Sequence, residues 1–209
     1  MTVSKRGNLS SDRQLDYGSV LLAETVTLAN DKNPYSGMTN PVLLDGQTSF
    51  VFESIPQNFT HLRLIFSDMA HTENSNSGYR LKMAINGDTS NTRYYTRSGI
   101  PGGGNYGAQG HTADNTDSVY IGYIHRPENT TWSSSGELYI PLYSKQMPYN
   151  QRTGWGQWWS LSTFGYPYVV GWNYYNNVAA SLPVTSLSFT MDGAKAFRSN
   201  SKVSLYGIK

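Results

Sequence analysis

The chain has 209 residues, and its 16 basic and 14 acidic side chains give a formal net charge of +2. A charge so close to neutral predicts neither a nucleic-acid-binding surface nor an acidic tail. The absence of cysteine excludes disulfides and thiolate sites. Because charged residues are only 14% of the chain, neutral polar residues must keep it soluble, a pattern typical of extracellular and virion β-proteins.

The amino-terminal sequence MTVSKRGNLSSDRQLDYGS has no apolar segment of the kind found in signal peptides. No apolar run approaches the ~18 residues needed to cross a membrane, so we expect no membrane insertion. We expect the protein to be assembled in a host cytoplasm. Residues 1–17 are polar and aperiodic, which predicts an amino-terminal arm or docking peptide. The folded unit is expected at 18–209.

Apolar and polar residues alternate in several short segments, and this alternation indicates strands with one buried face. His61–Ser67 is the clearest, with leucine and phenylalanine inward and His61 and Arg63 outward. In Asn86-Gly87 the chain has a turn dipeptide that readily adopts positive φ. The expected strands are Val20–Leu28, Thr48–Ile55, His61–Ser67, Tyr79–Asn86, Ser118–His125, Glu137–Tyr143, others within the aromatic block Trp155–Tyr175, and two more in 184–209.

The closing segment, VTSLSFTMDGAKAFRSNSKVSLYGIK (184–209), contains two alternating runs joined by a polar connection, which predicts a hairpin that ends inside its own sheet. No segment of ten residues has a convincing helical period. Short strands separated by Gly, Pro, Asn and Ser turns predict one all-β domain, a β-sandwich of jelly-roll type.

One pattern of motifs runs through three segments of the chain in order. They are TSFVFESIPQNFTHLRLIFSDMA (48–70), MAINGDTSNTRYY (83–95) and the closing segment 184–209. The pattern is an aromatic strand, Ile-Pro, a Thr-His-Leu-Arg-Leu strand, an Asn-Gly-Asp turn and a terminal Ser-Leu-Tyr-Gly-Ile. In order and separation it resembles a family of tailed-bacteriophage virion proteins, found in tails, fibres and head decoration. The resemblance implies a β-sandwich used for assembly or surface binding, with no catalytic residues to transfer. It leaves the place in the virion open.

The glycine-rich stretch 96–117 departs from that family and contains PGGGNYG (101–107). It lacks the GxxxxGK[ST] pattern and no helix follows, so we expect a β–β connection or assembly loop instead of a phosphate site. His111, Asp114 and Asp117 could share a calcium or magnesium ion, but their spacing matches no established loop. We expect no metal and no cofactor.

Nothing in the sequence matches a common catalytic motif: the four histidines lie far apart, and HExxH and GxSxG are both missing. Glu128 and Glu137 flank Trp132 and could form the carboxylate pair of a glycosidase. Carboxylates at this separation are common by chance, so we predict a protein that is not an enzyme.

The aromatic block GWGQWWSLSTFGYPYVVGWNYYNN (154–177) also departs from the family and holds nine aromatic residues. Trp and Tyr combine flat apolar faces with a polar edge, which suits protein interfaces and sugar stacking alike. Alternation places Trp158 and Trp159 on opposite faces of a strand. One interpretation is core plus subunit interface; the other is glycan binding. The candidate glycan or interface contacts are Trp155, Trp159 and Trp172 as platforms, Tyr174 and Asn176 as polar partners, and Tyr106 as a second contact.

The patterns predict a non-enzymatic β-protein, and the resemblance implies that it is a structural component on the capsid or tail surface of a tailed-phage particle, in contact with other virion proteins. The arm at 1–17 would help to anchor it. The alternative is a module of a tail fibre or tail tip that binds a host-surface glycan. Surface aromatics in a charge-poor chain are best hidden between subunits, and the resemblance implies a homotrimer.

Overall fold

The computed structural model describes residues 20–22, 27–29, 42–44, 46–73, 78–90, 94–99, 112–124, 133–160, 167–175 and 182–208. Within them the chain forms β-strands and two short 3-10 turns, Pro148–Asn150 and Asp192–Ala194. No helix in these stretches is long and apolar enough to cross a membrane.

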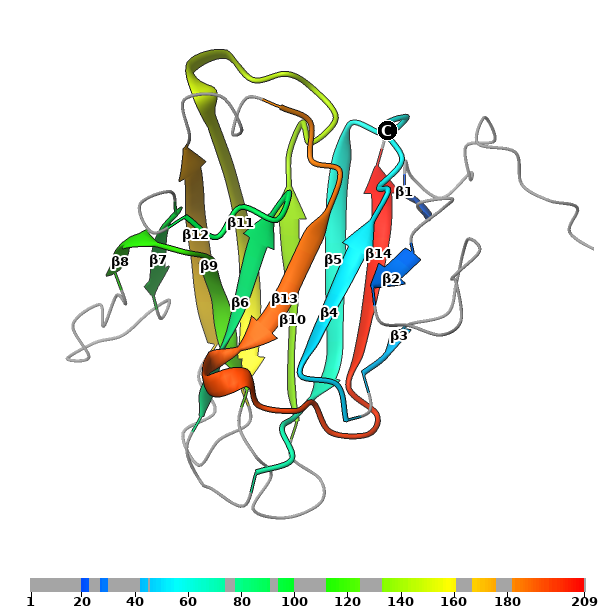
Figure 1. Ribbon diagram of the computed structural model, residues 1–209, viewed down its shortest axis with the longest axis vertical. Helices are drawn as coiled ribbons and strands as arrows, with labels where there is room; N and C mark the ends of the chain where they lie inside the picture. Colours follow the sequence, from blue (N-terminus) through cyan, green and yellow to red (C-terminus); the bar gives the residue numbers. More distant parts are fainter. Residues whose placement is uncertain are drawn as a thin grey trace, which may run out of the picture.

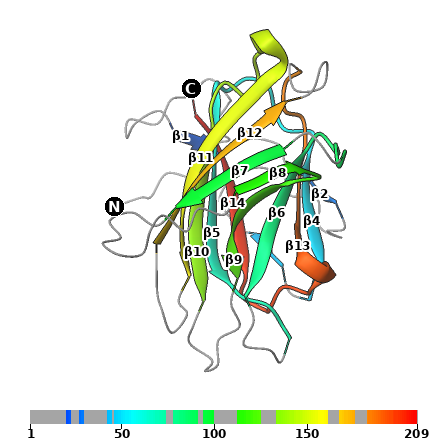
Figure 2. The ribbon, with the colours of Figure 1, turned by 90° about the vertical axis from the view of Figure 1, so that its left-hand side faces the viewer.

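Two antiparallel sheets pack face to face, which confirms the predicted all-β sandwich (Figures 1 and 2). The larger, nine-stranded sheet has the order β1 (Val20–Leu22), β14 (Lys202–Ile208), β5 (His61–Met69), β10 (Ser134–Ile140), β11 (Gln151–Ser160), β12 (Pro167–Tyr175), β7 (Tyr94–Gly99) and β8 (Thr112–Thr116), with β3 (Val42–Leu43) paired to β14. The smaller, five-stranded sheet has the order β2 (Thr27–Ala29), β4 (Ser49–Glu53), β13 (Leu187–Met191), β6 (Tyr79–Ile85) and β9 (Val119–Ile124).

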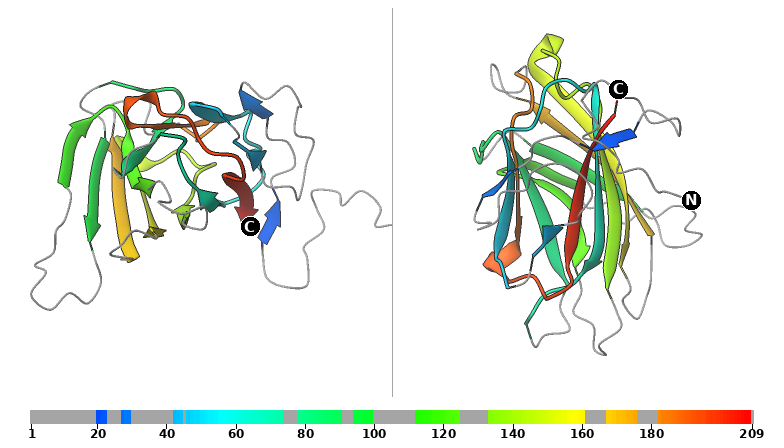
Figure 3. Two further views of the ribbon diagram at one scale, coloured as in Figure 1. Left: turned by 90° about the horizontal axis from the view of Figure 1, so that it is seen from below. Right: turned by 90° about the vertical axis from the view of Figure 1, so that its right-hand side faces the viewer.

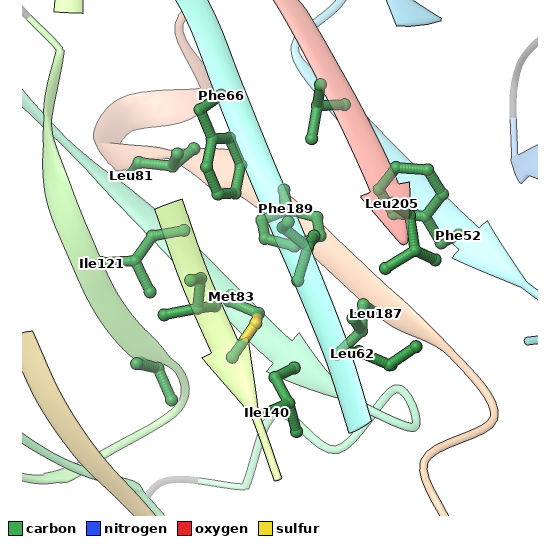
Figure 4. Close-up of a cluster of buried hydrophobic side chains, with 14 of the residues drawn as sticks. Phe52, Leu62, Phe66, Leu81, Met83, Ile121, Ile140, Leu187, Phe189 and Leu205 are labelled. Atoms are coloured by element: carbon green, nitrogen blue, oxygen red, sulfur yellow. The ribbon is translucent and has the colours of Figure 1, made fainter. Parts of the chain in front are cut away.

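The core lies between the sheets, where the alternating strands turn their apolar side chains toward each other. Figure 4 shows Phe66, Ile140 and Leu205 of the larger sheet meeting Met83 and Phe189 of the smaller one. All five are buried. Burial of one such side chain stabilises the fold by about 1.5–3 kcal/mol relative to leaving it exposed.

The jelly-roll prediction is finer than the strand order supports. Strands β10, β11 and β12 follow one another along the chain and are also neighbours in the larger sheet. This antiparallel meander keeps three consecutive strands in one layer. The structure therefore establishes a two-sheet sandwich without establishing the jelly-roll connections.

The prediction of a closing hairpin in 184–209 is wrong, because β13 pairs with β4 and β6 whereas β14 pairs with β5, β3 and β1 of the other sheet. Figure 3 shows the carboxyl-terminal strand in the larger sheet. The connection between them crosses from sheet to sheet and is pinned on the way: Phe197 is buried, and its N–H donates to the carbonyl of Gln47. Ser201 Oγ accepts a hydrogen bond from the backbone N–H of Ala70 at 3.1 Å. The last described strand, β14, does lie inside a sheet, as expected.

Two predicted boundaries also change. The glycine-rich stretch 96–117 was expected to be a loop, but β7 and β8 occupy parts of it, because the backbone pairing of β7 with β12 and of β8 with β7 does not require apolar side chains. Residues Val20–Leu28 were expected to form one strand. Their described parts belong to β1 in the larger sheet and β2 in the smaller one.

The predicted strand Glu137–Tyr143 ends early, at Ile140. Leu142 has a positive φ of 48°, which interrupts the alternation. As a result Leu142 is exposed while Tyr143 is fully buried. Continued alternation from Leu138 and Ile140 would have turned Leu142 inward and Tyr143 outward. The Tyr143 hydroxyl donates a hydrogen bond to the carbonyl of Pro56.

A buried arginine fixes the start of β11. Arg152 is 1% exposed, and its guanidinium donates to the carbonyls of Leu182, Leu142 and Lys145 at 3.0, 3.1 and 2.6 Å. Burial lowers the pKa of Arg152 to about 10. These carbonyls belong to two connections at one end of the sandwich, so the side chain holds both of them against β11.

The Asn-Gly-Asp turn after β6 is hydrogen-bonded to the segment that precedes β13. Asn86 and Gly87 both have positive φ, of 52° and 69°, as a type I′ turn requires, and the turn leads from β6 in the smaller sheet toward β7 in the larger one. The side-chain oxygen of Asn86 accepts from the backbone N–H groups of Thr185 and Ser186 at 2.8 and 3.1 Å. The turn therefore holds the segment that leads into β13.

Candidate functional site

Strand β11 turns one set of aromatic side chains inward and another outward. Trp158 is 1% exposed, whereas Trp155 and Trp159 are 48% and 47% exposed. This confirms the predicted split between Trp158 and Trp159. The two exposed indoles lie on the side of the larger sheet that faces away from the smaller sheet.

We call this surface the outer face. It consists of the outward residues of β5, β10, β11 and β12, which the cross-strand register brings together. Its members are His61, Arg63, Ile65, Ser67, Ser135, Glu137, Tyr139, Gln151, Thr153, Trp155, Gln157, Trp159, Val169, Gly171, Asn173 and Tyr175.

Three rings form a row across the outer face. The ring centroids of His61 and Tyr139 are 5.4 Å apart with an interplanar angle of 30°. Those of Tyr139 and Trp155 are also 5.4 Å apart, at 36°. Such separations and small angles are closer to offset stacking than to edge-to-face packing. The indole of Trp155 therefore turns one face toward Tyr139 on β10.

The row ends beside a glycine. Trp155 is paired with Tyr139 on one side and with Gly171 of β12 on the other. A Cβ atom placed on Gly171 would have no atom within 4 Å beyond its chain neighbours. On its β12 side, Trp155 therefore borders a space above the backbone of Gly171 that no described side chain fills.

Polar groups lie among the rings. Arg63 donates from Nε and Nη2 to the same carboxylate oxygen of Glu137, at 2.9 and 2.5 Å. His61, expected on the solvent face beside Arg63, is half-buried, and its Nδ1 accepts from the N–H of Leu142 at 3.0 Å. An exposed ion pair of this kind contributes at most about 1 kcal/mol to stability, but it keeps Glu137 in place next to the aromatic row.

The prediction that Trp172 and Tyr174 are contact residues is wrong for the chain in this fold. Alternation along β12 turns both inward, and they are 2% and 0% exposed. The indole of Trp172 covers Gly154: a Cβ placed on Gly154 would be 2.3 Å from Cζ2 of Trp172. The Tyr174 hydroxyl donates to Oδ2 of Asp88 at 2.9 Å, and its ring stacks on Tyr94 at 4.7 Å. Both are core residues.

Other predicted residues fall elsewhere. Asn176 and Tyr106, together with residues 1–17, lie outside the described residues. The same holds for His111, Glu128 and Trp132, and for the side chain of Asp114. Asp117 Oδ1 accepts from the hydroxyl of Ser118 at 2.8 Å. In the part of the chain that the structure describes, no three His, Asp or Glu side chains are grouped to hold a metal ion.

Sequence reasoning missed Tyr139 and Gly171 as parts of the face. Alternation alone places Tyr139 outward on its strand, but only the register of β10 with β11 places it beside Trp155. Gly171 carries no side chain, so no pattern of residue types could point to it.

Comparison of the chain with protein-family models, with curated proteins and with solved structures found no match.

Proposed function

We propose that this chain is a non-enzymatic β-sandwich module that binds a host-surface glycan through its outer face, as part of a tailed-phage particle. The observation that carries the proposal is the aromatic row that ends at Trp155 beside open space over Gly171. A sugar ring has apolar C–H faces that stack on aromatic rings and hydroxyls that need polar partners. The setting on a virion rests on the resemblance of three sequence segments.

The composition of the outer face favours a sugar over a permanent subunit contact. An ion pair, Arg63–Glu137, and the polar side chains Gln157 and Asn173 are interspersed with the rings. Permanent interfaces are more apolar and are depleted in charged residues at their centre. A ligand that carries hydroxyl groups satisfies this mixture better than a second apolar protein surface.

The second candidate is the structural one, in which the chain contacts other virion proteins or forms a homotrimer. It is favoured by the apolar area that Trp155, Trp159, Val169 and Tyr175 expose on one side of the sheet, because exposed apolar patches mark interaction sites. In that case Trp155→Ala would lower the sedimentation mass of the protein or its incorporation into particles. The wild type would then bind no glycan on the array.

A glycan array tests the proposal with purified wild type, Trp155→Ala and Trp159→Ala. Tyr149→Ala is the matched control, because Tyr149 is an aromatic residue that is 93% exposed but not part of the outer face. We expect binding by the wild type and the control, with a loss of at least tenfold for Trp155→Ala. Silence of the wild type across an array of bacterial surface polysaccharides would reject glycan binding.

A further inference from the structure

We infer that the space over Gly171 is a subsite for one pyranose ring of the glycan, stacked on the side of the Trp155 indole that is turned toward β12. This inference rests on the proposed function and adds to it the place and the chemical class of the contacted ring. It follows from the surroundings of Gly171, from the ring row and from the residues on either side.

Gly171 is an exception among the glycines whose surroundings the structure describes. Each of the other eight has either a positive φ or an atom less than 3 Å from where its Cβ would be. Those glycines are required by a turn or by close packing. Gly171 has neither a positive φ nor a close neighbour, although glycine within a strand destabilises it. A glycine inside a strand often marks a bulge, a bend, or a close approach of a ligand or another backbone, and the register of β12 with both neighbouring strands runs through Gly171 without a bulge.

The wall of the subsite is aromatic. His61, Tyr139 and Trp155 stack in sequence across β5, β10 and β11. On β12 the next position of the row is Gly171. A flat ring placed over Gly171 would continue the row and cover the indole face that no side chain of β12 covers.

The ends of the subsite differ in polarity. Val169 and Asn173 stand two residues before and after Gly171, so their Cα atoms are roughly 13 Å apart along the strand. Asn173 is paired with the exposed Thr153, and Val169 is paired with Gln157. Amide and hydroxyl groups can both donate and accept hydrogen bonds. This pattern, one apolar wall with donors and acceptors at the rim, fits a pyranose ring with its C–H face and peripheral hydroxyls.

The test is to fill the space without disturbing the fold. In Gly171→Val the new Cβ would have no atom within 4 Å beyond its chain neighbours, and its two methyl groups would occupy the subsite. Thr190→Val is the matched control, because Thr190 is exposed on a strand of the smaller sheet. Cellohexaose, chitohexaose, a galacturonate hexamer and the strongest polysaccharide from the array are titrated into each variant, with circular dichroism and thermal melting as checks of folding.

We expect Gly171→Val to melt no lower than wild type and to lose at least tenfold in affinity for every probe that the wild type binds. Gly171→Ala should lose less, and Thr190→Val should bind as wild type does. Protons of the bound sugar should shift upfield, because they lie over the indole ring.

Three results would overturn the subsite. If Gly171→Val keeps its affinity while Trp155→Ala loses it, the glycan binds elsewhere on the outer face, and the proposed function stands without this subsite. If the wild type binds no probe and no array polysaccharide, the proposed function fails as well. If Gly171→Val instead changes the sedimentation mass of the protein, the space is part of a contact between copies of this chain.

Discussion

The indole of Trp158 occupies the space in which a side chain on Gly122 would stand: a Cβ on Gly122 would lie 2.3 Å from Cδ2 of Trp158. Trp158 belongs to the larger sheet and Gly122 to the smaller one. On the other side of the indole, a Cβ on Gly136 would lie 2.2 Å from Cε3. The indole N–H donates to the carbonyl of Tyr123 at 2.7 Å. This contact fixes β11 from the inside while Trp155 and Trp159 of the same strand face out.

Gly122→Ala should therefore destabilise the protein by about 1–3 kcal/mol, the usual cost of overpacking a core. The free energy of unfolding in urea measures the effect. Gly171→Ala is the matched control in the other sheet, since its Cβ would have no neighbour within 4 Å, and it should be neutral or stabilising. Equal free energies of unfolding for the two variants would contradict the packing described for Trp158.

Arg152→Leu should cost about 3 kcal/mol or more, because it removes the hydrogen bonds that a buried, charged guanidinium donates to the carbonyls of Leu182, Leu142 and Lys145, and bonds to charged groups contribute roughly 1.5–3 kcal/mol each. Arg63→Leu is the control, because its exposed ion pair with Glu137 contributes at most about 1 kcal/mol. Urea unfolding of both variants measures the difference. A loss for Arg152→Leu no greater than that for Arg63→Leu would show that the guanidinium does not hold these connections.

Stability should fall as the pH rises above about 10. Burial raises the pKa of Tyr143 to about 12 and raises that of Tyr94 as well, whereas a tyrosine in the unfolded chain ionises near pH 10. A raised pKa in the folded state gives stability that is complete below the unfolded pKa and is lost as the pH rises through the folded value.

Arg152 acts in the opposite direction. Burial lowers its pKa, so at high pH the unfolded state holds more protons than the folded state and this group adds stability as the pH rises. Two tyrosines outweigh one arginine, so the net change is a loss. Urea midpoints between pH 8 and 11.5 should fall for wild type and fall less steeply for Tyr143→Phe. Midpoints that stay constant over this range would be inconsistent with the burial of these hydroxyls.

Glu137→Gln should leave bound polysaccharide intact and change stability by no more than about 1 kcal/mol, since the exposed ion pair with Arg63 is its described contact. Chain-length analysis of polysaccharide incubated with purified wild type and with the variant measures turnover. We expect no shortening with either protein. Shortening by wild type that disappears in Glu137→Gln would make the protein a hydrolase.

Local alternation predicted the class of fold and the opposite faces of Trp158 and Trp159, because the period of a strand is set by the backbone. It could not show that Trp172 is buried, because alternation separates the two faces of a strand without saying which of them packs against the other sheet. It also gave no sign that β13 and β14 lie in different sheets, because a polar connection can turn back beside its strand or cross the core. Alternation also could not predict the positive φ of Leu142, because this backbone angle arises from tertiary packing. The positive φ reverses which of the last residues of the expected strand are buried.

The outer face can be observed through the indole N–H resonances of ¹⁵N-labelled protein, recorded while the strongest polysaccharide from the array is added. Trp155 should show the largest shift, and Trp159 a smaller one. Trp158 and Trp172, both buried, should stay nearly unchanged. Shifts confined to the buried indoles, or an unchanged Trp155 at saturation, would contradict glycan binding at the outer face.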